Sequence, residues 1–295
     1  MLHLSQGLLN LLSLCPRKFQ HTYLDQLNVP IAPEQQERIN WGDRFHLLMQ
    51  QRELGLRPDA LEPEQFSEDW QVTQSVNAFT QAVPELFAPK QLASEQLAPE
   101  PLAPEQPALD AKSGTVAQSR QSEHARSLQF QGYLFTVIYD LLILDPQQAQ
   151  ILDWKTYPRP QNPKWLEQNW QTRLYPFVLA ETSPYSPDQI SMTYWFVQPP
   201  VHSAHPDSAR PTPKPECFKF AYSEAQHQQT HQDLTRLLHQ FREDLQQYQT
   251  HHRPFPQTLS LKTCESCAFA FRCQRGLRQE EEPIVTLEEI AEVAL

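Results

Sequence analysis

The chain has 295 residues, of which 39% are hydrophobic and 20% are charged, so it can bury a sizeable core and is not disordered throughout. A formal net charge of −11 argues against a protein that binds nucleic acid strongly, because phosphate contacts are made mainly by Lys and Arg. However, six of the glutamates lie in residues 279–295, which hold no Lys or Arg, so the rest of the chain is only mildly acidic. No apolar run reaches the length of a membrane span and the N-terminal residues lack a signal-peptide pattern, so we expect a cytoplasmic protein with no membrane partner.

The N-terminal part is predicted to be helical. Ser5 is a favourable N-cap for a leucine-rich helix that Pro16 limits. A second helix is predicted near Gly42, where His46 lies beside an apolar face, and residues 70–87 have a helical pattern too.

Many prolines lie in the middle of the chain. The 27 prolines cluster, whereas only 6 residues are glycine, and residues 91–105 form an imperfect five-residue repeat that cannot supply a core. We therefore predict a single domain over 1–295 that contains a disordered or extended Pro-rich insertion at 88–122 and ends in an acidic tail at 279–295.

A β-hairpin is the clearest sheet signal. The run 130–144 is rich in β-branched and aromatic residues, and the turn sequence DPQQ separates it from the apolar run 149–156. Asp140 lies within the first predicted strand and Asp153 near the end of the second, so the two carboxylates can approach each other across the pair. Lys155 shares a face with Asp153 because side chains two apart in a strand point the same way.

Two carboxylates and a lysine suit metal-dependent hydrolysis of phosphate esters. Carboxylate oxygens are ligands for Mg²⁺ or Mn²⁺, which lower the pKa of bound water, and a lysine can position that water, help deprotonate it or neutralise developing charge. The bare D-x-K spacing is weak evidence by itself, since an ordinary strand-end aspartate and a solvated Asp–Lys pair show the same pattern.

The rest of the chain predicts further α/β structure. A helix is expected from about 165 to 181 with a kink at Pro176, followed by strands at 190–198 and 217–222 and a long helix from about Ser223. This order indicates an α/β domain with a central mixed sheet flanked by helices.

Four motifs in this order resemble those of the PD-(D/E)XK nuclease superfamily, and specifically its RecB-like branch. They are Cys15-Pro16-Arg17-Lys18-Phe19, Gly42-x-x-x-His46, the hairpin with Asp140 and Ile151–Thr156, and Gln171–Tyr175. Val137 stands where many relatives have glycine, and Pro176 follows the tyrosine directly; both departures affect local geometry rather than the ligands.

The resemblance implies a restriction-endonuclease-like core and a role for each motif residue. It makes Asp140 and Asp153 ligands of Mg²⁺ or Mn²⁺, Lys155 catalytic and His46 an additional metal ligand. Gln171 and Tyr175 would contact the DNA or order the site. A packed core histidine and a surface polar stripe remain alternatives for His46 and for the Gln–Tyr pair. Glu123 could match an acidic residue of some members, but it borders the predicted insertion, so we assign it no role.

The cysteines form a second constellation. Cys264, Cys267 and Cys273 lie close together after the long helix, whereas Cys15 stands alone near the N-terminus. The combination resembles the [4Fe–4S] staple of AddB-like and CRISPR-adaptation RecB-like nucleases and implies a cluster held by these four thiolates. Zinc and unligated thiols are the alternatives. Cys217 is interpreted as a buried thiol.

These features predict a metal-dependent DNA nuclease with a role in repair, recombination or defence. The resemblance implies an exonuclease or an enzyme that acts on single-stranded DNA or on ends, together with protein partners in such pathways. A non-catalytic DNA-binding or scaffold subunit with the same fold is one alternative. A zinc-stapled interaction protein that docks through its acidic tail is another.

Overall fold

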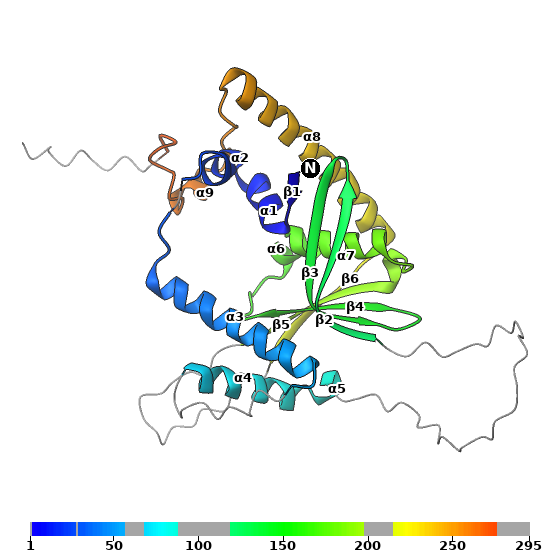
Figure 1. The fold of residues 1–295 in the computed structure, drawn as a ribbon. Coiled ribbons are helices and arrows are strands. Elements are labelled where there is room, and N and C mark those ends of the chain that lie inside the picture. The colour runs from blue at the N-terminus through cyan, green and yellow to red at the C-terminus, as the bar shows by residue number, and fades with distance from the viewer. Residues whose placement is uncertain (1, 28, 57–67, 88–118, 198–214, 276–295) are drawn as a thin grey trace, which may run out of the picture. The chain divides into compact units, whose positions relative to one another are not determined.

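The computed structural model describes residues 2–27, 29–56, 68–87, 119–197 and 215–275 (Figure 1). Its contacts divide the chain into two compact units. The first, here called the sheet unit, comprises Met1–Gln6 and Ile31–Asp233, and the second, the cysteine unit, comprises Gly7–Pro30 and Leu234–Leu295. The expected insertion from 88 to 118 and the acidic tail lie outside the described residues.

The described part of the sheet unit contains a mixed six-stranded sheet, which confirms the predicted fold class. Its strands are β1 (Leu2–Leu4), β2 (Ser119–Phe130), β3 (Tyr133–Leu144), β4 (Ala149–Lys155), β5 (Ile190–Phe196) and β6 (Glu216–Ala221). β3 pairs along its length with antiparallel β2, and its first residues also pair with parallel β1. β4 is antiparallel to the end of β3 and parallel to β5, which pairs with antiparallel β6.

The predicted β3–β4 hairpin is confirmed, and its turn is closed by Asp145. The Asp145 Oδ1 atom accepts hydrogen bonds from the backbone amides of Gln147 and Gln148, both at 2.9 Å. Such Asx interactions replace the backbone hydrogen bonds that the turn cannot make.

The C-terminal boundary predicted for the insertion is wrong by a few residues. We expected it to extend to residue 122, but β2 begins at Ser119, so residues 119–122 belong to the sheet. β2 was missed because its side chains are mostly polar and alternate only between half-buried and exposed positions, as expected of a strand at the sheet edge. The short strand β1, ahead of the predicted first helix, was missed as well.

The β3–β4 pair opens into a fork. Its register ends with Leu141 opposite Leu152, and beyond this point β4 follows β5 as far as Lys155, opposite Phe196. Asp140 therefore lies on β3 at the point where the two strands diverge. A fork of this kind leaves room between the strands for polar side chains.

Three helices pack on one hydrophobic core of the sheet unit. They are α3 (Pro33–Glu53), α4 (Glu68–Ala82) and α5 (Pro84–Phe87). Their buried side chains include Phe45, Met49 and Phe79, which pack with Leu141 and Trp154 of the sheet. α3 begins at Pro33, earlier than the expected start near Gly42, because proline is favourable in the first turn of a helix.

The helix predicted at 165–181 is interrupted. It consists of α6 (Lys164–Gln168) and α7 (Trp170–Thr182), separated by Asn169. The Asn169 side chain accepts a hydrogen bond from the Gln171 amide at 2.9 Å and so caps α7. This cap places Gln171 in the first turn of the helix.

The cysteine unit is built from both ends of the described chain. It contains most of α1 (Gln6–Leu14), α2 (Pro16–Phe19), the π-helical turn η1 (Gln20–Leu24), the second part of α8 (Glu224–His251) and α9 (Leu261–Glu265). The ring of Phe19 packs on those of Phe241 and Phe255, at centroid distances of 5.3 and 6.2 Å. The Gln20 side chain accepts a hydrogen bond from the Phe255 amide at 2.8 Å.

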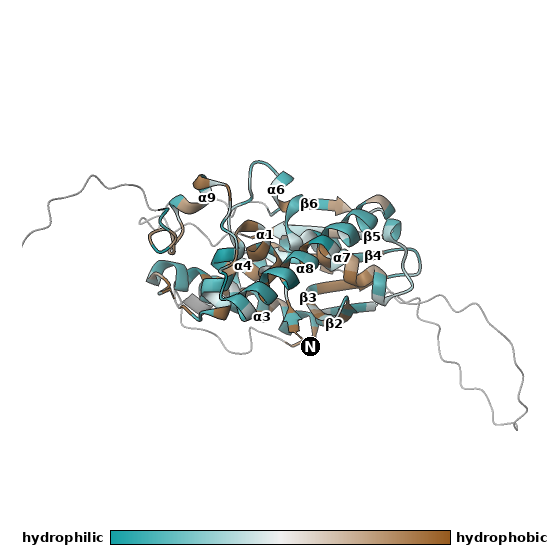
Figure 2. Cartoon of the chain, turned by 90° about the horizontal axis from the view of Figure 1, so that it is seen from above, coloured by the Kyte–Doolittle hydropathy of each residue, from teal (hydrophilic) through white to brown (hydrophobic). Residues whose placement is uncertain are grey.

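Hydropathy differs between the central strand β3 and the long helix α8. In Figure 2, β3 is largely hydrophobic, whereas the visible face of α8 is hydrophilic. None of the described helices combines the length and the apolarity needed to cross a membrane.

Candidate functional site

Three polar side chains form a closed triangle beside the fork. The Lys155 Nζ atom lies 2.7 Å from Asp153 Oδ2 and donates a hydrogen bond to Gln171 Oε1 at 2.9 Å. The side-chain Nε2 atom of Gln171 in turn donates a hydrogen bond to Asp153 Oδ1 at 2.6 Å. Asp153 and Lys155 are two apart on β4, so their predicted shared face is what brings the carboxylate and the ammonium together.

Burial gives this triangle unusual electrostatics. Asp153 is only 2% exposed, and burial, reinforced by the negative charge of Asp140, raises the pKa of its carboxyl to about 6. Burial also disfavours the Lys155 ammonium, but the adjacent Asp153 outweighs that effect and raises the lysine pKa above its usual value. Lys155 is therefore a cation at neutral pH.

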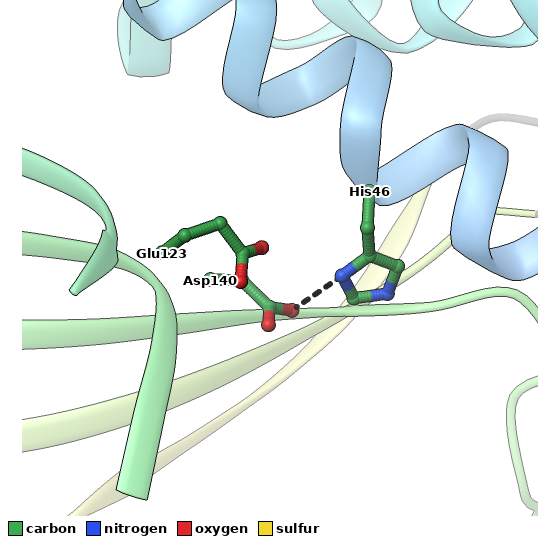
Figure 3. Close-up of side chains that lie close together, drawn as sticks. All are labelled: His46, Glu123 and Asp140. Carbon is green, nitrogen blue, oxygen red and sulfur yellow. Dashed lines mark ion pairs between the residues drawn. The ribbon is translucent and has the colours of Figure 1, made fainter. Parts of the chain in front are cut away.

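The second cluster consists of His46, Glu123 and Asp140, which could hold a metal ion. One ligand atom from each lies within 4.8 Å of the others. Figure 3 shows the imidazole of His46 on α3 facing the two carboxylates from the strands. The His46 Nδ1 atom lies 3.4 Å from Asp140 Oδ2, and that oxygen also accepts a hydrogen bond from the Trp154 amide at 2.7 Å.

The sequence predicted two members of this cluster and placed a different residue third. His46 and Asp140 come together as expected, but Asp153 is not grouped with them within 4.8 Å and instead belongs to the triangle with Lys155 and Gln171. Glu123, to which the sequence assigned no role, takes the third position.

Glu123 reaches the cluster through a disfavoured backbone conformation. Its φ of 48° is left-handed, which costs a residue with a side chain roughly 1–2 kcal/mol. The β2–β3 register is continuous through Ser122 and resumes at His124, so the ladder is interrupted at Glu123, opposite Asp140. Strained residues of this kind concentrate at functional sites, which supports a role for Glu123.

The negative charges around this cluster favour a positive charge within it. Burial disfavours protonated His46, but the hydrogen bond and charge of Asp140, with the charges of Asp153 and Glu123, outweigh burial and raise the His46 pKa to about 9. Burial and then the charge of Asp140 raise the pKa of Glu123. Two carboxylates and an imidazole fit Mn²⁺, and the carboxylates also fit Mg²⁺, so the donor set suits a divalent cation.

Gly42 lets α3 approach the end of β4. It lies one helical turn before His46, and an added Cβ at this position would be 3.1 Å from Thr156 Oγ1. A larger side chain would push α3 away from the residue that follows Lys155. The Gly42-x-x-x-His46 spacing thus has a packing reason: it holds the imidazole close to the fork.

The comparison with family models decides the classification. The model described as the PD-(D/E)XK nuclease superfamily matches residues 3–274. The chain belongs to this superfamily. PD-(D/E)XK proteins are generally nucleases that use divalent metal ions, and the match spans the fork, both side-chain clusters and all five cysteines. A search of curated proteins found no significant match.

The two residues predicted on α7, Gln171 and Tyr175, lie near the carboxylates just described. Gln171 completes the triangle with Asp153 and Lys155. Tyr175 is buried one turn further on, and its ring packs perpendicular to that of Tyr139 at 5.5 Å. The Tyr139 hydroxyl also donates a hydrogen bond to the Tyr175 carbonyl oxygen at 3.0 Å. This geometry favours an ordering role for both α7 residues.

The cysteine unit gathers the four thiols predicted to act together. Cys15, Cys264, Cys267 and Cys273 are free thiols that line one cavity of about 20 Å³. Burial raises the pKa of Cys273, Arg17 opposes this shift, and the other three thiols add to it, because all lie close enough to interact electrostatically.

Cys217 is not part of this group. It lies on β6 in the sheet unit and is exposed, so the prediction of a buried thiol was wrong. The reason is that β6 is an edge strand with a mostly exposed burial pattern.

Proposed function

We propose that this protein is a divalent-metal-dependent nuclease that hydrolyses DNA phosphodiester bonds at the fork between β3 and β4. The observation that carries the proposal is the closed Asp153–Lys155–Gln171 triangle next to the His46–Glu123–Asp140 cluster. An exonuclease that acts on ends or on single-stranded DNA, in repair, recombination or defence, is the form that the resemblance favours.

The two carboxylates and the imidazole would hold the metal ion, with Asp153 as a neighbouring acid. A bound Mg²⁺ or Mn²⁺ supplies Lewis acidity: it lowers the pKa of water and neutralises charge on the phosphate. Asp140 is held for this task by the Trp154 amide, which fixes one of its oxygens. His46 is oriented through its other ring nitrogen, which lies 3.1 Å from the Trp154 carbonyl oxygen.

Lys155 would act as an electrostatic and positioning group. Since its pKa is raised, it carries a proton and donates hydrogen bonds, so it stabilises the negative charge that grows on the phosphate oxygens during attack. Gln171 holds the ammonium and the Asp153 carboxylate in a fixed relation. The pair is thereby preorganised before substrate binds.

A nuclease assay tests this proposal directly. The purified chain is incubated with single-stranded and duplex DNA labelled at either end, with Mn²⁺, with Mg²⁺ or with EDTA. We expect cleavage with either metal and none with EDTA, and the length of the first labelled products shows whether cutting starts at an end. DNA binding without cleavage under every metal condition would refute the nuclease and indicate the non-catalytic DNA-binding subunit.

We also propose that Cys15, Cys264, Cys267 and Cys273 hold a [4Fe–4S] cluster, with Zn²⁺ as the rival occupant. The support is that four thiols from opposite ends of the described chain line a single cavity. Such a group would cross-link residues 7–30 to the segment around α9 and stabilise the cysteine unit by closing a long loop.

Replacing Cys15 with serine should abolish the cluster. Protein purified without oxygen is expected to be brown, with roughly four iron atoms per chain, and the Cys15→Ser variant to be colourless and to melt at a lower temperature. Cys217→Ser is the matched control and should keep its colour, because Cys217 is exposed on β6. If the wild-type protein is colourless and holds one zinc ion per chain, the iron–sulfur proposal is wrong and the four thiols form a zinc site.

A further inference from the structure

A larger cavity in the cysteine unit is used by neither side-chain cluster of the candidate site. It has a volume of about 400 Å³, adjoins Cys15, Cys264 and Cys267, and is otherwise lined by hydroxyl groups, one leucine and two lysines. These last three residues are Leu14, Lys18 and Lys262. The cavity therefore offers both apolar and cationic contacts.

Large apolar side chains protrude beside this cavity. Leu259 is 96% exposed and lies between Thr258 and Ser260, which line the cavity, while Leu261 is 64% exposed and precedes Lys262. Phe271, which is 92% exposed, lies between Ala270 and Cys273, and residues 270 and 273 line the adjoining smaller cavity. Several such side chains within thirteen residues indicate a surface that another chain segment covers.

The described residues of the cysteine unit carry a net positive charge, although the chain as a whole is at −11. The described residues of this unit contain eight lysines and arginines but only four aspartates and glutamates. Within the described part of the chain no carboxylate forms an ion pair with Lys18, Lys262 or Arg272. The surface thus combines exposed apolar groups with positive charge that no described residue neutralises.

The segment 279–295 has the complementary chemistry. It contains six glutamates and no Lys or Arg, interleaved with the aliphatic residues Ile284, Val285, Leu287, Ile290, Val293 and Leu295. It follows Arg275 of the cysteine unit after only a few residues, so its local concentration at this surface is in the millimolar range. Fully extended, the 17 residues of this segment span at most about 60 Å.

We propose that residues 279–295 dock on the surface formed by Lys18, Leu259, Leu261, Lys262, Phe271 and Arg272, here called the basic–apolar surface. The aliphatic side chains cover the exposed leucines and phenylalanine, and the glutamates pair with the lysines and the arginine. Docking shields the cavity that adjoins three of the cysteines. As a polyanion, the segment also occupies positive charge that DNA phosphates would otherwise contact. The docking itself does not depend on nuclease activity.

Photo-crosslinking of the full chain tests the docking. Leu287 is replaced by p-benzoylphenylalanine, the dilute protein is irradiated without metal or DNA, and the crosslinked peptides are identified by mass spectrometry. We expect crosslinks to residues 258–272 and 14–18, at a several-fold lower yield in 1 M salt, where the Debye length falls to about 3 Å. Crosslinks confined to the sheet unit, or found only between isotopically distinct chains, would overturn the proposal.

Matched variants separate charge from misfolding. Lys18→Glu with Lys262→Glu should lower the crosslink yield at least fivefold, whereas Lys219→Glu, an exposed lysine on β6, should not change it. The tail variant Glu288→Gln, Glu289→Gln and Glu292→Gln should lower the yield equally, and all three positions lie outside the residues that the structure describes. Unchanged yields in both the lysine and the glutamate variants would refute the charge pairing.

The apolar contacts and the rival occupant are tested in the same system. Leu259→Ser with Phe271→Ser should lower the yield several-fold, while Leu54→Ser, 66% exposed on the sheet unit, serves as the control and should leave it unchanged. Single-stranded DNA is the alternative occupant. If the lysine pair variant weakens binding of an oligonucleotide while Leu287 crosslinks map elsewhere, the surface belongs to DNA and the docking proposal is wrong.

Discussion

Replacing Lys155 by alanine should lower the rate of metal-dependent DNA cleavage by a factor of roughly 10²–10³ while DNA binding is retained. The ammonium is the group in the triangle that carries positive charge, and it is held in place by Asp153 and Gln171 before any substrate arrives. Its loss removes charge stabilisation that grows only in the transition state. Single-turnover cleavage at saturating protein measures the cleavage rate, and fluorescence anisotropy with EDTA measures DNA binding.

Two further variants make this result interpretable. Lys164→Ala removes an exposed lysine on α6 and should keep nearly full activity. Lys155→Ala leaves the Asp153 carboxylate buried without its counter-charge, which can cost about 3–5 kcal/mol of stability. The double variant Asp153→Asn with Lys155→Met removes both charges and should restore the melting temperature without restoring cleavage. Cleavage by Lys155→Ala within threefold of wild type contradicts the proposed role.

Mn²⁺ affinity should increase with pH, by about tenfold per unit between pH 6.5 and 8.5. The pKa of His46 is raised to about 9, so below that value its imidazole carries a proton that the metal ion must displace. Affinity therefore falls as the pH falls and levels off only above about pH 9. Isothermal titration calorimetry at several pH values gives the slope directly.

Removing the imidazole should flatten this dependence. His46→Ala is expected to bind Mn²⁺ more weakly at pH 8.5 and with a much smaller pH slope, because no histidine proton competes. Glu123→Gln keeps the histidine but removes one carboxylate, so affinity should fall roughly tenfold or more while a pH slope persists. A wild-type affinity that is independent of pH would refute the role of His46 as a ligand.

The local rules of β-structure were sufficient to predict the lysine half of the site. The hairpin follows from two β-prone runs around the DPQQ turn, and the two-residue spacing of Asp153 and Lys155 requires a shared face. The same reasoning placed Asp140 opposite the second strand. The helical position of His46 followed from the apolar pattern around it, which is also a local property, whereas its role as a ligand came from the resemblance of Gly42-x-x-x-His46 to the family motif.

The features that the sequence did not predict depend on distant contacts. Glu123 reaches the site through a positive φ on a polar edge strand, and no residue pattern in its neighbourhood indicates that conformation. The separation of Asp153 from His46, Glu123 and Asp140 accompanies the end of the β3–β4 register at Leu152, beyond which β4 remains paired with β5. The break at Asn169 was hidden because apolar residues continue on both sides of it.

The composition of the cysteine unit from both chain ends sets an order of events during synthesis. Cys15 emerges from the ribosome roughly 250 residues before Cys264, which at 5–20 residues per second is about 12–50 s. The strands and helices that supply both clusters of the candidate site are all complete by Asp233, before the second part of the cysteine unit exists. The framework of the candidate site can thus form early, and the proposed four-cysteine site requires that the Cys15 thiol stay reduced until the other three cysteines are translated.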